Sequence, residues 1–162
     1  MLHTSEVINQ RLAVLIGLEV SGVNRAADML TMQFGPLREV RNYRGAIKKL
    51  GTWALHVQCD WELTHANAGD SLVSRADFSG TDEAIIEACR KMESILTSNG
   101  PTVVQRVLGD AAGGVFVEFS RSLTLTIVSD NQPGDEDWRF FSPRSDGDHF
   151  VIECGKVLTD DQ

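Results

Sequence analysis

The sequence predicts an α+β fold in which an antiparallel sheet of about 7–8 strands packs against one main helix at residues 81–97. Apolar and polar residues alternate through residues 53–63, and apolar residues recur at helical spacing through 81–97. Short polar links separate three further strand-like segments between residues 103 and 128. With 162 residues and 17.8 kDa, the chain fits a single α+β domain over residues 1–162.

The N-terminal half begins with two predicted strands and then a longer one. Apolar residues alternate from Leu12 to Val20 and again over 30–34, where Gly35-Pro36 ends the run. The longer strand covers residues 53–63. Its apolar positions are Trp53, Leu55, Val57, Cys59, Trp61 and Leu63, and its polar positions are His56, Gln58, Asp60 and Glu62. Because successive strand side chains point to opposite faces, this strand has one buried and one solvent-exposed face.

The helix is predicted from its start, its apolar stripe and its end. Ser79 or Thr81 can cap its N-terminus, and residues 98–101, Ser-Asn-Gly-Pro, end it. The stripe consists of Ile85, Cys89, Met92 and Leu96. We expect this stripe to pack on one face of the sheet, against the apolar positions of residues 53–63.

The C-terminal half holds four more predicted strands. They cover residues 103–108, 115–119, 123–128 and 149–153. Gly113-Gly114 fits the turn between the first two, and such short links require antiparallel neighbours. The polar segments 66–79 and 130–148 are predicted to be loops.

Charge and cysteine content limit the classes of partner and compartment. The net charge of −8 and the pI of about 4.9 argue against nucleic acid and are compatible with a basic protein partner. One basic stretch, Arg38, Arg41, Arg44, Lys48 and Lys49 around Tyr43, could contact phosphate, although such a stretch is more often a solvated loop. No signal peptide or membrane-spanning run is present in the sequence, and three widely spaced cysteines favour reduced thiols, so we expect a cytoplasmic protein.

The sequence contains none of the common catalytic or cofactor motifs. There is no glycine-rich phosphate loop, no nucleophile elbow and no cysteine pair with zinc-ligand spacing. His56 and Cys59 face opposite sides of the predicted strand, and Cys59 and Cys89 lie on apolar stripes, where thiols are usually inert. We therefore predict no catalytic residue, no metal and no cofactor.

Two surfaces are candidates for partner binding. The first is the acidic segment with Asp130, Asp135, Glu136 and Asp137, which ends at Trp138. An alternative is that Trp138 and Phe140 fold back into the core. The second surface is the polar face of residues 53–63. It carries His56, Asp60 and Glu62, where a histidine between carboxylates could also serve a small enzyme or a ligand-binding protein.

Four blocks of this sequence resemble blocks in a group of small, mostly uncharacterised bacterial proteins. They are residues 27–35, residues 51–61 with the run Trp-Ala-Leu-His-Val-Gln-Cys-Asp-Trp, residues 136–143 and residues 149–151. That group is distantly similar to WapI-type immunity proteins of bacterial toxin systems. The resemblance implies a non-enzymatic protein-binding module, an immunity-type inhibitor of a basic toxin. The group usually has Trp-Arg where this chain has Trp61-Glu62, which implies a different partner. A structural homodimer is a further alternative.

Overall fold

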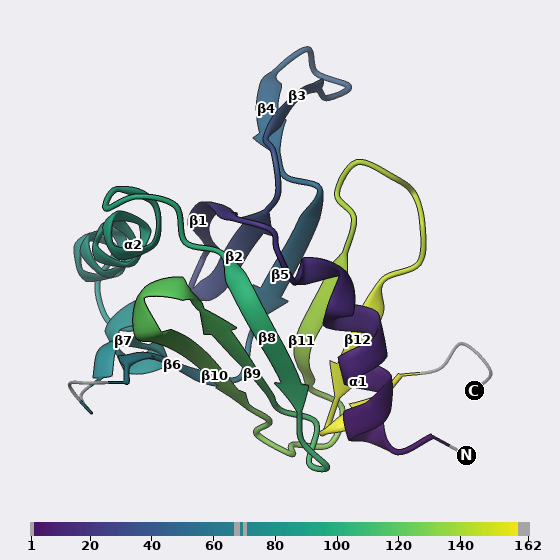
Figure 1. Ribbon diagram of the computed structural model, residues 1–162. Coiled ribbons are helices and arrows are strands. Elements are labelled where there is room, and N and C mark those ends of the chain that lie inside the picture. The colour runs from purple at the N-terminus through teal and green to yellow at the C-terminus, as the bar shows by residue number, and fades with distance from the viewer. Residues whose placement is uncertain (1, 67–68, 70, 159–162) are drawn as a thin grey trace.

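The computed structural model describes residues 2–66, 69 and 71–158 (Figure 1). Within these residues, thirteen strands form two antiparallel sheets and a separate hairpin, accompanied by two α-helices. The predicted α+β class with antiparallel sheets is confirmed. The prediction of one sheet with about 7–8 strands is wrong, because the strands are divided between layers that enclose a common core.

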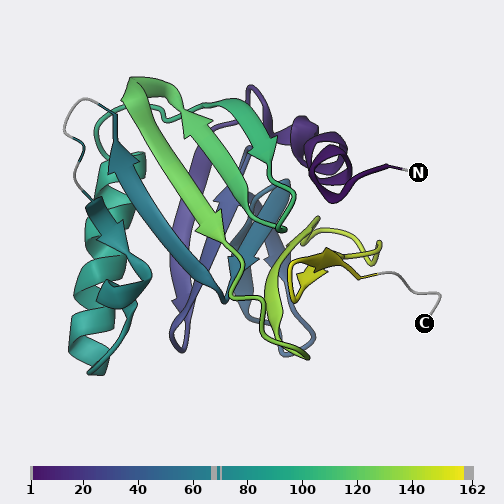
Figure 2. The same cartoon turned by 90° about the horizontal axis from the view of Figure 1, so that it is seen from below.

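The first sheet contains six strands from both ends of the chain. In spatial order they are β1 (Val20–Ala26), β2 (Met29–Phe34), β5 (Trp53–Val57), β11 (Glu136–Phe141), β12 (Phe150–Glu153) and β13 (Lys156–Val157). The second sheet comes from the middle of the chain. Its order is β7 (Ser71–Ser74), β6 (Asp60–His65), β10 (Leu123–Val128), β9 (Val115–Phe119) and β8 (Val104–Gly109). Figure 2 shows the second sheet in front of the first.

The separate hairpin consists of β3 (Arg38–Arg41) and β4 (Ile47–Leu50), and projects away from both sheets (Figure 1). It connects β2 to β5. Its two strands pair only with each other, so within the described residues it forms a sheet of its own.

The predicted helix is confirmed as α2 (Asp82–Thr97), but it covers the edges of the sheets rather than a face. The Thr81 hydroxyl accepts a hydrogen bond from the Ala84 amide (3.2 Å), as the capping prediction requires. The buried stripe packs mainly against β1, β7 and a 3₁₀ turn, Arg75–Phe78. Helix α2 therefore closes one open side of the sandwich, and Figure 2 shows α1 (Thr4–Leu12) on the opposite side, where it packs along β8.

The predicted strand from Leu12 to Val20 is wrong. Helix α1 ends at Leu12, a 3₁₀ turn (Ala13–Leu15) follows, and β1 begins only at Val20. Ile8, Leu12 and Leu15 are the buried residues, spaced four and three apart as in a helix, whereas Val14 and Ile16 are exposed. The apparent alternation spans the last residue of α1, the 3₁₀ turn and the connection that leads into β1.

The predicted strand 53–63 is also wrong as a single element. It breaks at Gln58-Cys59 into β5 of the first sheet and β6 of the second. Both amides at the break donate to the carbonyl oxygen of Asp137, at 2.8 and 3.1 Å, instead of continuing a regular ladder. The predicted apolar face nevertheless enters the core, because the segment stays extended through the break and keeps its alternation.

The other strand predictions are confirmed as β2, β8, β9, β10 and β12, with the predicted turn at Gly113 between β8 and β9. The two predicted loops contain regular structure. Within 66–79 lie β7 and the 3₁₀ turn Arg75–Phe78, and within 130–148 lies β11. Two consecutive acidic residues at its start, Glu136-Asp137, and two consecutive aromatic residues at its end, Phe140-Phe141, obscure the alternation in this strand.

Candidate functional site

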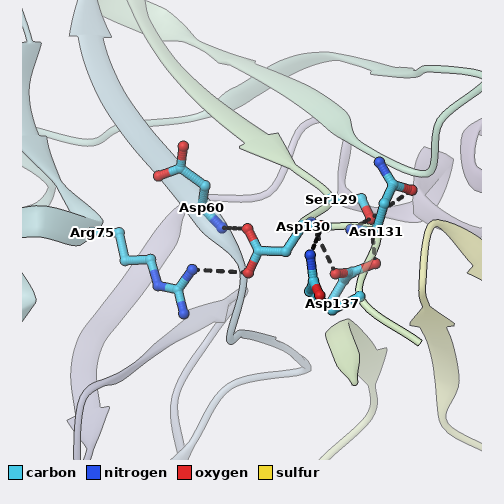
Figure 3. A network of polar contacts seen from close by, with 7 residues as sticks. Asp60, Arg75, Ser129, Asp130, Asn131 and Asp137 are labelled. Atoms are coloured by element: carbon cyan, nitrogen blue, oxygen red, sulfur yellow. Dashed lines mark hydrogen bonds and ion pairs between the residues drawn. The ribbon is translucent and has the colours of Figure 1, made fainter. Parts of the chain in front are cut away.

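The acidic segment contains a buried carboxylate at the point where the two sheets separate (Figure 3). Asp137 is buried in β11. Its Oδ2 accepts hydrogen bonds from the Ser129 hydroxyl (2.6 Å) and the Gly155 amide (2.8 Å), and its Oδ1 accepts one from the Asp130 amide (3.2 Å). Its main-chain carbonyl also accepts hydrogen bonds from the two amides of the strand break. Asp137 therefore connects four segments of chain: β11 itself, the strand break, the connection after β10 and the β12–β13 turn.

Trp138 is buried on the opposite face of β11, in the core between the sheets. Its indole N–H donates to the Gly113 carbonyl (2.8 Å), and its ring meets Phe150 edge to face. Gly113 has a φ of 91°, and a side chain there would collide with the backbone of Gly155. The core alternative for Trp138 and Phe140 is confirmed, and the prediction that Asp137 and Trp138 contact a partner fails, because neither reaches the surface.

The rest of the acidic segment lines a depression of about 470 Å³ outside this buried residue. Its lining residues are Asp28, Met29, Gln58, Arg75, Asp130, Gly134, Asp135 and Glu136. They come from the β1–β2 turn and the first residue of β2, the strand break, the 3₁₀ turn after β7, and the β10–β11 connection with the first residue of β11. The depression therefore forms where four connections meet at one end of the sandwich. We call it the acidic depression.

Two of its four carboxylates are held by neighbouring residues. Asp130 accepts hydrogen bonds from the Asp60 amide (3.3 Å) and from Arg75 (2.9 Å), as Figure 3 shows. Glu136 accepts from the Gln58 side chain (2.8 Å) and pairs with Arg139 (Nε to Oε2, 2.9 Å). These contacts fix two carboxylates at the wall of the depression.

The other two carboxylates are exposed to solvent. Within the described residues, the side chains of Asp28 and Asp135 have no hydrogen-bond or ion-pair partner. Among the described lining residues Arg75 is the one cation, so the acidic depression has an excess of negative charge. Such a surface attracts cationic groups through its summed field.

His56 is separated from Asp60 and Glu62, contrary to the predicted polar face. His56 lies on β5 in the first sheet, whereas the two carboxylates lie on β6 in the second, with their side chains exposed. The break at Gln58-Cys59 causes this separation, because it sends the two halves of the segment into different layers. The three residues therefore do not form one site.

His56 instead belongs to a second cluster on the outer face of the first sheet. Its ring meets the edge of Phe141 (4.8 Å), and Phe141 stacks on His149 (4.1 Å). Arg139 lies 2.9 Å from His149 Nδ1. Burial lowers the pKa of His56 below 6.5, and the charge of Arg139 lowers it further, while Glu136 acts in the opposite direction. The neutral imidazole is therefore the favoured form at neutral pH.

The thiols and the possible metal ligands offer little chemistry in the described part of the chain. Burial raises the pKa of Cys59, and the nearby carboxylates of Asp137 and Asp130 raise it further, so this thiol stays protonated. Burial also raises the pKa of Cys89. Across residues 2–66, 69 and 71–158, no group of three His, Cys, Asp or Glu side chains is placed to hold a metal ion. Over the same residues, no helix has the length and hydropathy of a membrane span.

Three lining residues with polar side chains, Asp28, Gln58 and Arg75, were not predicted from the sequence as site residues. They lie far apart in the chain, and each belongs to a turn or a break whose position depends on tertiary structure. The one local signal is the two-residue connection Ala27-Asp28 between β1 and β2, with a φ of 55° at Ala27. No protein family, curated protein or solved structure matches the chain.

Proposed function

We propose that the chain is a non-enzymatic protein-binding module that recognises a basic partner through the acidic depression. In this proposal the chain is an immunity-type inhibitor, as the resemblance of the sequence blocks implies. Its partner is a basic bacterial toxin, which it binds in the cytoplasm. The observation that carries the proposal is a pair of carboxylates, Asp28 and Asp135, that have no partner among the described residues and lie beside two that are already fixed.

This arrangement suits a lysine or arginine side chain of a partner. A cation about 4 Å from a carboxylate gains about 1 kcal/mol in water and about 4 kcal/mol where the pair is partly desolvated. The fixed carboxylates, Asp130 and Glu136, lose little conformational entropy on binding because their neighbours already hold them. A hollow of about 470 Å³ is large enough for side chains and too small for a folded element.

Titration with a short peptide rich in Lys and Arg tests the proposal directly. The double variant D28N/D135N should bind this peptide at least about tenfold more weakly than the unmodified protein, which corresponds to about 1.4 kcal/mol. The matched control is E6Q/E93Q, which removes the same charge from exposed positions on α1 and α2. It should change the affinity by less than about twofold, because screening weakens charges more than about 10 Å away. Equal losses in both variants would contradict the proposal.

Capture experiments then test for a protein partner. The unmodified protein and D28N/D135N are used as baits with a bacterial lysate, at low salt and at about 1 M salt, where the Debye length is about 3 Å. A basic protein retained by the unmodified bait alone, and released by salt, supports the proposal. Retention that is identical for the two baits contradicts it.

A small-ligand site at His56 is the second candidate, because Phe141, His149 and Arg139 surround this imidazole on an outer sheet face. A neutral histidine beside a guanidinium could act as a general base toward an anionic ligand. Proton NMR of His56 and His149 during titration with inorganic phosphate tests this candidate. Shifts that saturate and disappear in Arg139→Gln would support it, and unchanged shifts would contradict it.

A further inference from the structure

Residues 37–50, which we call the basic arm, form the projecting hairpin of β3 and β4 (Figure 1). The basic arm carries five cationic side chains and one carboxylate, Glu39. The cations are Arg38, Arg41, Arg44, Lys48 and Lys49. Because the net charge of the chain is −8, the remaining residues are more acidic than the whole chain. The structure therefore separates the two signs of charge in space, which the net charge alone does not reveal.

Both faces of the basic arm are cationic. The register pairs Arg38 with Leu50 and Val40 with Lys48, and residues opposite each other share a face. The other face has the pairs Glu39 with Lys49 and Arg41 with Ile47. A flat partner surface would contact only one face and leave the cations of the other unused. A two-walled anionic groove would contact both.

The tip of the basic arm is an ordered turn that displays an aromatic ring. The Asn42 side chain accepts hydrogen bonds from the amides of Arg44 (2.9 Å) and Ala46 (3.0 Å). The Arg44 guanidinium lies 5.3 Å from the centre of the Tyr43 ring, and Tyr43 is 89 % exposed. Ile47 is also exposed. These side chains face solvent with no cover from the rest of the described chain.

The base of the basic arm is held firmly by the first sheet and its connections. Arg144 donates to the carbonyl of Leu50 (3.0 Å) and to that of Pro36. Gln33 on β2 donates to the carbonyl of Lys49 (3.3 Å) and accepts from the Gly51 amide. An isolated two-stranded hairpin is marginally stable, so these contacts position the ribbon at its root and leave its outer part exposed.

We propose that the basic arm binds double-stranded DNA by placing its ribbon in the major groove. The major groove is about 12 Å wide and admits a two-stranded β-ribbon, and phosphates line both of its walls. Arg38 and Lys48 face one wall, and Arg41 and Lys49 face the other, while Tyr43 and Arg44 approach the base edges. The acidic depression takes no part, because it lies at the opposite ends of β2 and β5. This inference is independent of the proposed function.

Fluorescence anisotropy with a labelled duplex of about two helical turns, roughly 21 bp, tests this proposal. We expect the logarithm of the association constant to fall with the logarithm of salt concentration with a slope of about −4, as for four to five neutralised phosphates. In R41Q/R44Q the slope should change by about 2 and the affinity at low salt should fall at least about tenfold.

The matched control is R90Q/K91Q, which makes the same change in net charge at exposed positions on α2. It should bind the duplex within about twofold of the unmodified protein. Thermal unfolding checks that both variants are folded. Three results would overturn the proposal: no binding to the duplex at low salt, equal weakening by both double variants, or tighter arm-dependent binding to a glutamate-rich peptide or to a second copy of the chain than to DNA.

Discussion

Asp135 and Asp137 are two residues apart, but the structure gives them opposite environments. Asp137 is buried, and its carboxylate accepts three hydrogen bonds from donors on β10's end and the β12–β13 turn. Asp135 is exposed at the rim of the acidic depression, and within the described residues its carboxylate has no partner. In a run of like residues, charge alone does not distinguish a structural carboxylate from one that meets solvent.

The physical difference lies in where β11 begins. Residues before Glu136 belong to a connection, whereas Asp137 and Trp138 lie in a strand and are both buried. Stability and binding should therefore be separable by mutation within one short segment.

Replacing Asp137 with alanine should destabilise the fold by about 3 kcal/mol or more, because buried donors on Ser129, Asp130 and Gly155 lose their acceptor. The midpoint of urea unfolding measures this loss. Asp135→Ala is the matched control and should lie within about 0.5 kcal/mol of the unmodified protein. Similar destabilisation by the two variants would mean that the buried and exposed carboxylates do not differ as described.

Replacing Trp138 with phenylalanine should cost about 2 kcal/mol. The variant leaves the Gly113 carbonyl without its indole donor and removes volume from a packed interior. Urea unfolding again provides the measurement. Under conditions in which the variant is fully folded, its affinity for the basic peptide should be unchanged. A loss of peptide affinity in the folded variant would place Trp138 in the binding surface after all.

Replacing Arg75 with glutamine should change the free energy of unfolding by less than about 1 kcal/mol, because its ion pair with Asp130 is partly exposed to solvent. The same variant removes the cation from the acidic depression, so affinity for the basic peptide should rise. Calorimetric titration measures the affinity. Weaker peptide binding by Arg75→Gln would indicate that the depression does not select cations.

The smallest effect should come from His56, on the outer face of the first sheet. Because its pKa is lower in the folded protein than the usual 6.5, the unfolded chain binds the proton more strongly. This residue's contribution to stability is therefore complete above about pH 6.5 and is lost as the pH falls through the lowered folded value. As the pH is lowered from neutral to mildly acidic, the unfolding midpoint of His56→Gln should fall less steeply than that of the unmodified protein.

Local patterns predicted the elements whose sequence signals agree. Helix α2 has a capping threonine, a clear stripe and a stop signal, and β8, β9 and β10 are joined by short links that force antiparallel pairing. The alternation in residues 53–63 correctly assigned which side chains enter the core. Its extent as one strand could not be predicted, because the break depends on the carbonyl of Asp137, far away in the sequence.

The candidate site was predicted only in part for the same reason. Asp130, Asp135 and Glu136 do line one surface, as their proximity in the chain suggested. Arg75 and Asp28 complete that surface from separate connections, and only the folded arrangement brings them there. His56 was grouped with Asp60 and Glu62 by strand periodicity, which carries no information on a change of sheet.

The many bonds to Asp137 have a consequence for local opening of the protein. The amides of Gln58 and Cys59 bind its carbonyl, and those of Asp130 and Gly155 bind its carboxylate. Each of these amides must break its hydrogen bond to Asp137 before it can exchange with solvent. Their hydrogen exchange should therefore be slow and should follow one common opening event. These four amides are spread over nearly a hundred positions of sequence. Equal protection factors at all four would show that the two sheets open as one cooperative unit.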